Sequence, residues 1–107
     1  MKPATFAPAY VALYPALAEI AREHGYSLSI HGTVSRDFDL VACPWTEEAG
    51  AAEELVKALA ERLHLVCGIF GTGIDGPEQK PHGRVAWSLL IGAGSFVDIS
   101  VMPRVEG

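Results

Sequence analysis

A strand–turn–strand pattern over residues 30–42 constrains the fold more than any other feature of this chain. Residues 26–31 alternate between apolar and polar side chains and lead into a Gly-Thr turn, and the apolar segment 38–43 follows within a few residues. So short a connection between two segments with strand periodicity predicts a tight antiparallel hairpin. The chain is therefore expected to build a sheet around this hairpin.

The second strand of the hairpin opens with two carboxylates, Asp37 and Asp39, and a third, Asp98, lies inside the apolar segment 95–102. Side chains alternate along a strand, so Asp37 and Asp39 share a face roughly 6–7 Å apart. If the two strands are neighbours, the three acids form a cluster suited to Mg²⁺ and to two-metal phosphoryl chemistry. The alternative is that they are protective edge charges, with Arg36 and Asp37 forming a surface ion pair.

The composition of the chain is typical of a globular protein. The chain has 107 residues, half of them hydrophobic and a fifth charged, which predicts one globular domain spanning residues 1–107. A net charge of −5 disfavours a nucleic-acid polymer as partner, because such binders carry a basic stripe.

Cys43 and Cys67 end apolar runs and are expected to be small buried side chains in a reducing cytosol. Prolines interrupt the N-terminal apolar residues, so a cytoplasmic protein with no membrane partner is expected.

The remaining elements follow from periodicity and from helix signals. Pro15 is expected either to start a helix that ends at His24 or to kink a longer one. Thr46 is expected to cap a second helix running to about His64. Strands are predicted at 65–71, 85–91 and 96–102, with a long loop at 72–83. The order α-β-β-α-β-β-β predicts an α+β sandwich, with the helices on one face of a mixed or antiparallel sheet.

Several further side chains have the chemistry to hold a phosphorylated ligand. Cations can clamp phosphates and indole rings can stack on a base. A histidine before the turn can contact a ligand or move a proton, although backbone partners would satisfy it equally well. A solvated loop and core indoles are the alternatives for the rest. These candidate ligand-binding residues are His31, Gly32, Thr33, Arg36, Trp45, Lys80, His82, Arg84 and Trp87.

The element order and the motif together resemble the minimal core of the DNA polymerase β-like nucleotidyltransferase superfamily. The matching residues are Gly32-Thr33, Asp37-Phe38-Asp39-Leu40 and Asp98. The resemblance implies a nucleotidyltransferase-like fold in which Gly32 and Thr33 hold nucleotide phosphates and the three acids hold magnesium. Only three residues separate Thr33 from Asp37. This spacer is much shorter than the family's, and it leaves no room for the short helix that meets the phosphates.

A second resemblance covers about two-thirds of the chain. The segments RDFDLVACPWTEEA and KPHGRVAWSLLIGAGSFVDISVMPR are similar to a group of short uncharacterised proteins encoded in tailed-phage genomes. This resemblance implies a phage origin and the cytoplasm of the host cell. Small phage proteins often counter host defence, in some cases by binding nucleotide immune signals such as cyclic dinucleotides or cyclic ADP-ribose derivatives.

Three functions are therefore in competition. The first is a non-catalytic binder that sequesters a small nucleotide signal, in a pocket that a second subunit completes. The second is a metal-dependent nucleotidyltransferase or phosphodiesterase that uses Asp37, Asp39 and Asp98. The third is a phage accessory protein that binds another protein. The shortened turn favours the first, because a binding cradle tolerates geometry that in-line displacement does not.

Overall fold

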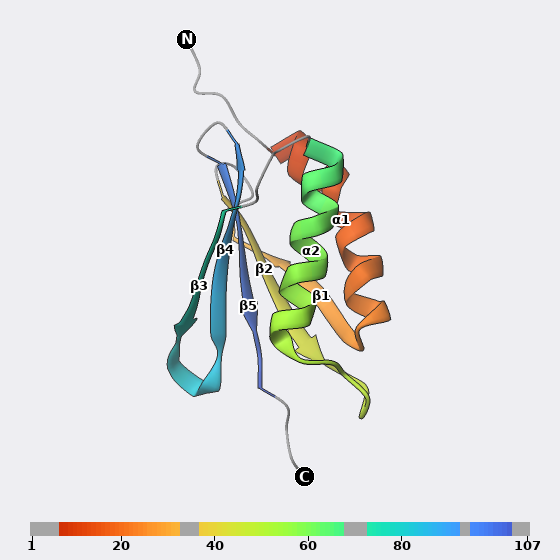
Figure 1. The fold of residues 1–107 in the computed structure, drawn as a ribbon, viewed down its shortest axis with the longest axis vertical. Coiled ribbons are helices and arrows are strands. Elements are labelled where there is room, and N and C mark those ends of the chain that lie inside the picture. The colour runs from red at the N-terminus through yellow and green to blue at the C-terminus, as the bar shows by residue number, and fades with distance from the viewer. Residues whose placement is uncertain (1–6, 33–36, 68–72, 93–94, 104–107) are drawn as a thin grey trace.

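The structure is a computed structural model that describes residues 7–32, 37–67, 73–92 and 95–103. The predicted order of helices and strands, α-β-β-α-β-β-β, is confirmed within these residues. Figure 1 shows the elements in chain order: α1 (Ala7–Glu23), β1 (Tyr26–His31), β2 (Asp37–Pro44), α2 (Ala52–Cys67), β3 (Ile74–Gln79), the 3-10 turn η1 (Pro81–Gly83), β4 (Val85–Gly92) and β5 (Ser95–Val101).

The five strands form one mixed sheet in the order β1-β2-β5-β4-β3. β1 and β2 form the predicted antiparallel hairpin, and β4 and β5 form a second one. β2 and β5 run parallel in the middle of the sheet although they are far apart in the chain. The two strands that carry the predicted acids are therefore neighbours.

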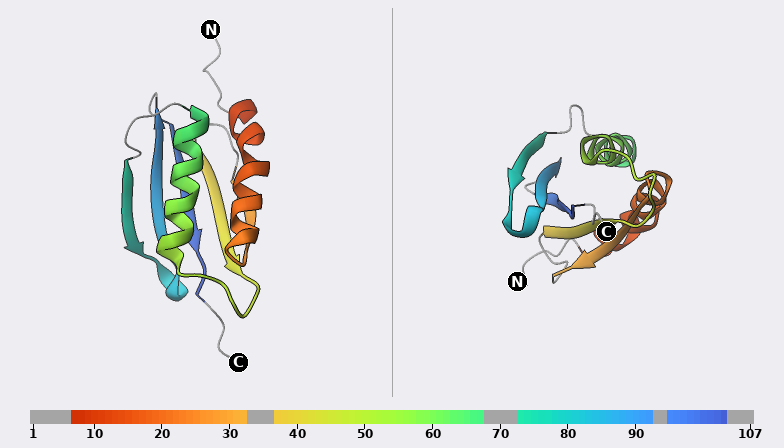
Figure 2. Two further views of the ribbon diagram at one scale, coloured as in Figure 1. Left: turned by 45° about the vertical axis from the view of Figure 1, so that its right-hand side comes forward. Right: turned by 90° about the horizontal axis from the view of Figure 1, so that it is seen from below.

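Both helices pack on the same face of the sheet (Figure 2), which confirms the predicted α+β arrangement. Alternation along β2 explains the packing, because Phe38, Leu40 and Ala42 are buried while Asp39 and Val41 on the other face are half-buried. The helices contribute Leu17, Leu55, Leu59 and Leu63, all at most 1% exposed, to this core. We call the sheet face turned away from the helices the open face.

α1 is a single helix that includes Pro15, so the longer of the two predicted helices is the one observed. Proline inside a helix leaves one backbone carbonyl of the preceding turn without its usual partner. Here the burial of Leu17, Ile20 and Ala21 on the side facing the core outweighs that cost. No helix of the described residues has the length and apolar character needed to cross a membrane.

The predicted start of the second helix is wrong. α2 begins at Ala52, and residues 45–51 form a loop held by distant partners. Trp45 donates its backbone N–H to the Gly25 carbonyl at 3.0 Å, and the Tyr26 hydroxyl donates to the Gly50 carbonyl at 2.8 Å. These bonds tie the loop to the turn after α1, so the chain turns here instead of starting a helix at Thr46.

The third strand is also in a different place from the one predicted. Residues 65–67, expected in a strand, continue α2, and β3 occupies residues 74–79 of the predicted long loop. Its Gly-Pro pair is unusual in a strand but is tolerated at the edge of a sheet and at a bulge. β3 pairs only with β4 and its register shifts between Asp75 and Glu78, which satisfies both conditions.

Candidate functional site

Five polar side chains lie at one level across the sheet, one from each strand. In the pairing of β1 with β2, His31 lies opposite Asp39. In the parallel pairing of β2 with β5, Asp39 lies beside Asp98. Ser88 pairs with Asp98 on one side and with Asp75 on the other. Adjacent strands lie about 4.8 Å apart, so consecutive members are close neighbours. We call these residues the polar row: His31, Asp39, Asp98, Ser88 and Asp75.

A short hydrogen bond fixes the carboxylate at the centre of the row. The Ser88 hydroxyl donates to Asp98 Oδ1 at 2.6 Å, which is the length of a hydrogen bond to a charged oxygen. Asp98 is half-buried, and its second oxygen accepts no hydrogen bond from any described residue. Asp98 therefore keeps a defined orientation and one oxygen available for a ligand.

Asp39 lies against the turn that ends the first strand of the hairpin. Gly32 has a φ of +77°, and a Cβ built there would approach Asp39 Oδ2 to 2.8 Å. A side chain at position 32 would displace the carboxylate as well as strain the backbone. Glycine at this position therefore lets Asp39 pack against the turn.

Part of the predicted phosphate cradle lies outside the described residues. Thr33 and Arg36 fall in the undescribed segment 33–36, and the side chain of Asp37 is not described either. The backbone of Asp37 starts β2 and pairs in register with Phe96. Of the three predicted acids, the structure thus describes the side chains of Asp39 and Asp98, and it brings them together.

The donor set of this pair fits a hard divalent cation. Asp39 and Asp98 supply carboxylate oxygens from adjacent strands, and Mg²⁺ prefers one or two carboxylates completed by water and substrate phosphate. Among the side chains that the structure describes, no three of His, Cys, Asp or Glu gather closely enough to hold a metal. The described residues alone therefore provide a two-carboxylate site.

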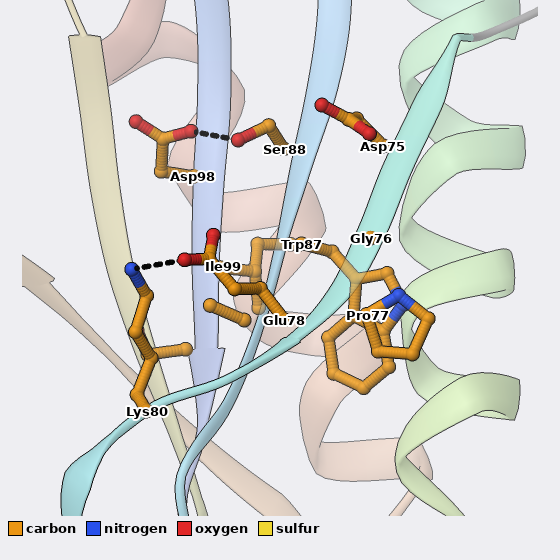
Figure 3. Close-up of a pocket in the computed structure, with 11 residues that line it drawn as sticks. Asp75, Gly76, Pro77, Glu78, Lys80, Trp87, Ser88, Asp98 and Ile99 are labelled. Carbon is orange, nitrogen blue, oxygen red and sulfur yellow. Dashed lines mark hydrogen bonds and ion pairs between the residues drawn. The ribbon is translucent and has the colours of Figure 1, made fainter.

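A groove of about 420 Å³ opens on the same face next to Asp98 (Figure 3). Three carboxylates and one ammonium line it, and the ammonium of Lys80 pairs with Glu78 at 3.1 Å. The groove therefore has an excess of negative charge. Its lining residues are Asp75, Gly76, Pro77, Glu78, Lys80, Ala86, Trp87, Ser88, Asp98, Ile99 and Ser100.

Of the predicted cations and indoles that the structure describes, His82, Arg84 and Trp45 do not gather around Asp39 and Asp98. Arg84 precedes β4 at the end of the sheet away from Asp39, and its guanidinium contacts Ser100 Oγ at 3.5 Å. His82 is exposed in η1, close to Arg84 in the chain. Trp45 is 65% exposed beyond the end of β2 and lies six residues from Asp39, a span of about 20 Å along a strand.

Trp87 is 5% exposed and belongs to the hydrophobic core, and it is also among the residues that line the groove. Core packing was one of the two interpretations of this residue. Of the predicted basic residues that the structure describes, only Lys80 lines the groove. The structure thus brings together His31, Gly32, Asp39 and Asp98. It leaves His82, Arg84 and Trp45 nearer the other end of the sheet.

The sequence-based prediction missed two members of the polar row, Ser88 and Asp75. Ser88 carried a detectable signal, because it alternates with the apolar residues Trp87 and Leu89 and so faces the side of β4 opposite the core. Asp75 carried none, since Asp-Gly-Pro is typical of a loop.

Comparison of the chain with models of known protein families, with curated proteins and with solved structures gives no match.

Proposed function

We propose that this protein binds a small nucleotide through a divalent cation held by Asp39 and Asp98. The register that places these two carboxylates side by side on β2 and β5 carries the proposal. The packing of Gly32 against Asp39 and the hydrogen bond from Ser88 to Asp98 support it, because both restrict the carboxylates to one arrangement. When bound, the cation supplies positive charge for a phosphate group.

The charge of the groove supports an essential cation. Without a cation, a nucleotide phosphate would be repelled by the carboxylates of Asp98 and Asp75, neither of which has an ion pair with a described residue. A Mg²⁺ ion bound by Asp39 and Asp98 would neutralise these two carboxylates and offer its remaining coordination positions to the phosphate. The roles of this chain's own residues are then to orient the ion with Asp39 and Asp98, and to keep Asp98 in place through Ser88.

The resemblance to tailed-phage proteins extends the proposal to a biological role. A phage protein that binds a host nucleotide without converting it would sequester an immune signal in the host cytoplasm. Metal-dependent nucleotidyl transfer or phosphodiester hydrolysis is the second candidate, because paired carboxylates that hold Mg²⁺ are also the basis of that chemistry. Recovery of the ligand separates the two.

The test is a thermal-shift screen with mass spectrometry of the same samples. Nucleoside triphosphates, cyclic dinucleotides and ADP-ribose derivatives are each added with Mg²⁺ or with EDTA. A ligand at a hundred times its dissociation constant stabilises the fold by about 2.7 kcal/mol. We expect a shift with Mg²⁺ only, and a ligand that is recovered unchanged. A ligand recovered with a new mass would identify an enzyme instead.

Two variants locate the site. Asp98→Asn removes one carboxylate and should abolish the Mg²⁺-dependent shift. Glu61→Gln changes the net charge equally on the exposed side of α2 and should leave that shift intact. If no ligand in the panel stabilises the protein, or if Asp98→Asn responds as the unmodified chain does, the proposal is wrong.

A further inference from the structure

The groove beside Asp98 has a volume of about 420 Å³, which is in the range of small-molecule sites. Its lining includes Ser88 of β4, and Asp98 and Asp75 lie on either side of Ser88 (Figure 3). Two strand spacings separate Asp98 from Asp75, which is about 10 Å between backbones. A purine nucleotide whose phosphate is held at Asp98 can therefore place its base beside Asp75.

Gly76 and Pro77 of β3 form part of the lining next to Asp75. Gly76 carries no side chain and adopts a φ of +124°, and a Cβ there would lie 2.8 Å from the Ala86 carbonyl oxygen. Pro77 follows it and presents an apolar ring in the groove lining. Position 76 thus accepts only glycine without displacement of β4, and this close approach holds the strand that carries Asp75 against β4.

The polar groups of the groove have an uneven balance of donors and acceptors. The Ser88 hydroxyl donates to Asp98, and the Lys80 ammonium is paired with Glu78. The carboxylate of Asp75 has neither a hydrogen bond nor an ion pair with any described residue. The Ser100 hydroxyl lies on β5, where it accepts from Arg84. On the β3 side of Ser88, the polar side chain left for a base is thus Asp75, an acceptor with two oxygens.

We propose that this groove prefers guanine nucleotides, with the Asp75 carboxylate accepting hydrogen bonds from N1–H and from the 2-amino group of the base. This inference rests on the proposed nucleotide site at Asp39 and Asp98. Guanine presents two adjacent donors that match the two carboxylate oxygens. Adenine presents one amino donor next to the acceptor N1, which faces a carboxylate unfavourably, and hypoxanthine keeps only the N1–H donor.

The test measures dissociation constants by isothermal titration calorimetry in Mg²⁺ for GTP, ITP and ATP, and for cyclic di-GMP and cyclic di-AMP. A hydrogen bond to a charged group is worth about a tenfold change in affinity or more. We expect each guanine nucleotide to bind about tenfold more tightly than its adenine counterpart, with ITP between GTP and ATP. Asp75→Asn should bring the guanine and adenine nucleotides to within about twofold of each other.

Glu78→Gln is the matched control, because it removes the same charge from the same groove, at a carboxylate already paired with Lys80. It should keep the guanine preference. Equal affinity for guanine and adenine nucleotides in the unmodified protein, or loss of the preference in both variants, overturns this inference while the proposed function stands. Absence of Mg²⁺-dependent binding by all five nucleotides overturns both. Asp75 is exposed, so Asp75→Asn is expected to fold, and circular dichroism checks this.

Discussion

The stack of Tyr10 on Phe38 reports the register on which the site depends. Both side chains are 0% exposed, with ring centroids 5.0 Å apart and an interplanar angle of 9°. Because strand side chains alternate, Phe38 in the core places Asp39 on the open face. A slip of β2 by one residue would turn Phe38 to the open face and Asp39 into the core. The energetic coupling between the two rings therefore tests the placement of Asp39.

A double-mutant cycle with Tyr10→Leu, Phe38→Leu and the pair measures this coupling by urea denaturation. Each single substitution should cost about 1–2 kcal/mol, since it replaces a buried ring by a smaller side chain. Stacked aromatic pairs contribute about 0.5–1.5 kcal/mol beyond their buried area. The loss of stability in the double mutant should therefore be smaller than the sum of the two single losses by about 1 kcal/mol. That is a measurable part of a total stability of about 5–15 kcal/mol.

Phe96 is the control, because it lies two residues before Asp98 on the open face of β5 and is 37% exposed. Phe96→Leu should cost about 0.5 kcal/mol or less and should add to Tyr10→Leu within about 0.5 kcal/mol. Strict additivity of Tyr10→Leu with Phe38→Leu, or coupling of Tyr10 to Phe96 instead, would refute the register and with it the pairing of Asp39 with Asp98.

The other stability predictions concern the turn after α1 and the polar row. Gly25→Ala should cost about 2 kcal/mol or more in urea denaturation, because Gly25 has a φ of +83° and a Cβ would lie 2.5 Å from Thr46 Oγ1. Gly50→Ala, where the nearest atom is 3.7 Å away, should change stability by less than about 1 kcal/mol. Ser88→Ala removes a 2.6 Å hydrogen bond to a carboxylate and should cost about 1.5–3 kcal/mol by the same measurement. Ser100→Ala removes only a 3.5 Å contact and should cost less than about 0.5 kcal/mol, and equal costs for the two serines would contradict this assignment.

Features that depend on local sequence could be predicted. The hairpin of β1 and β2 follows from two short alternating segments joined by a Gly-Thr turn, and the structure confirms it. The face on which Asp39 lies follows from its position between Phe38 and Leu40. In both cases the residues that determine the feature lie within a few positions of one another in the chain.

Features that depend on distant partners could not be predicted in the same way. Asp39 and Asp98 become neighbours only because β5 inserts between β2 and β4, and nothing in either segment specifies this. The late start of α2 depends on hydrogen bonds from Trp45 and Gly50 to the turn after α1. β3 forms despite its Gly-Pro pair because β4 provides an edge on which a bulged strand can lie.

The separation of the acids from the predicted cations changes how an anionic ligand is held in the proposed site. If Arg84 and His82 carried the phosphate, its charge would be balanced at the end of the sheet away from Asp39, where no carboxylate of the polar row lies. Among the described residues, Lys80 is the one predicted cation that lines the groove, and it is already paired with Glu78. In the proposed site, a Mg²⁺ ion rather than these side chains would supply the positive charge beside Asp98. For that reason nucleotide affinity should follow the Mg²⁺ concentration and should change little in Arg84→Gln, a result that titration calorimetry at several Mg²⁺ concentrations would decide.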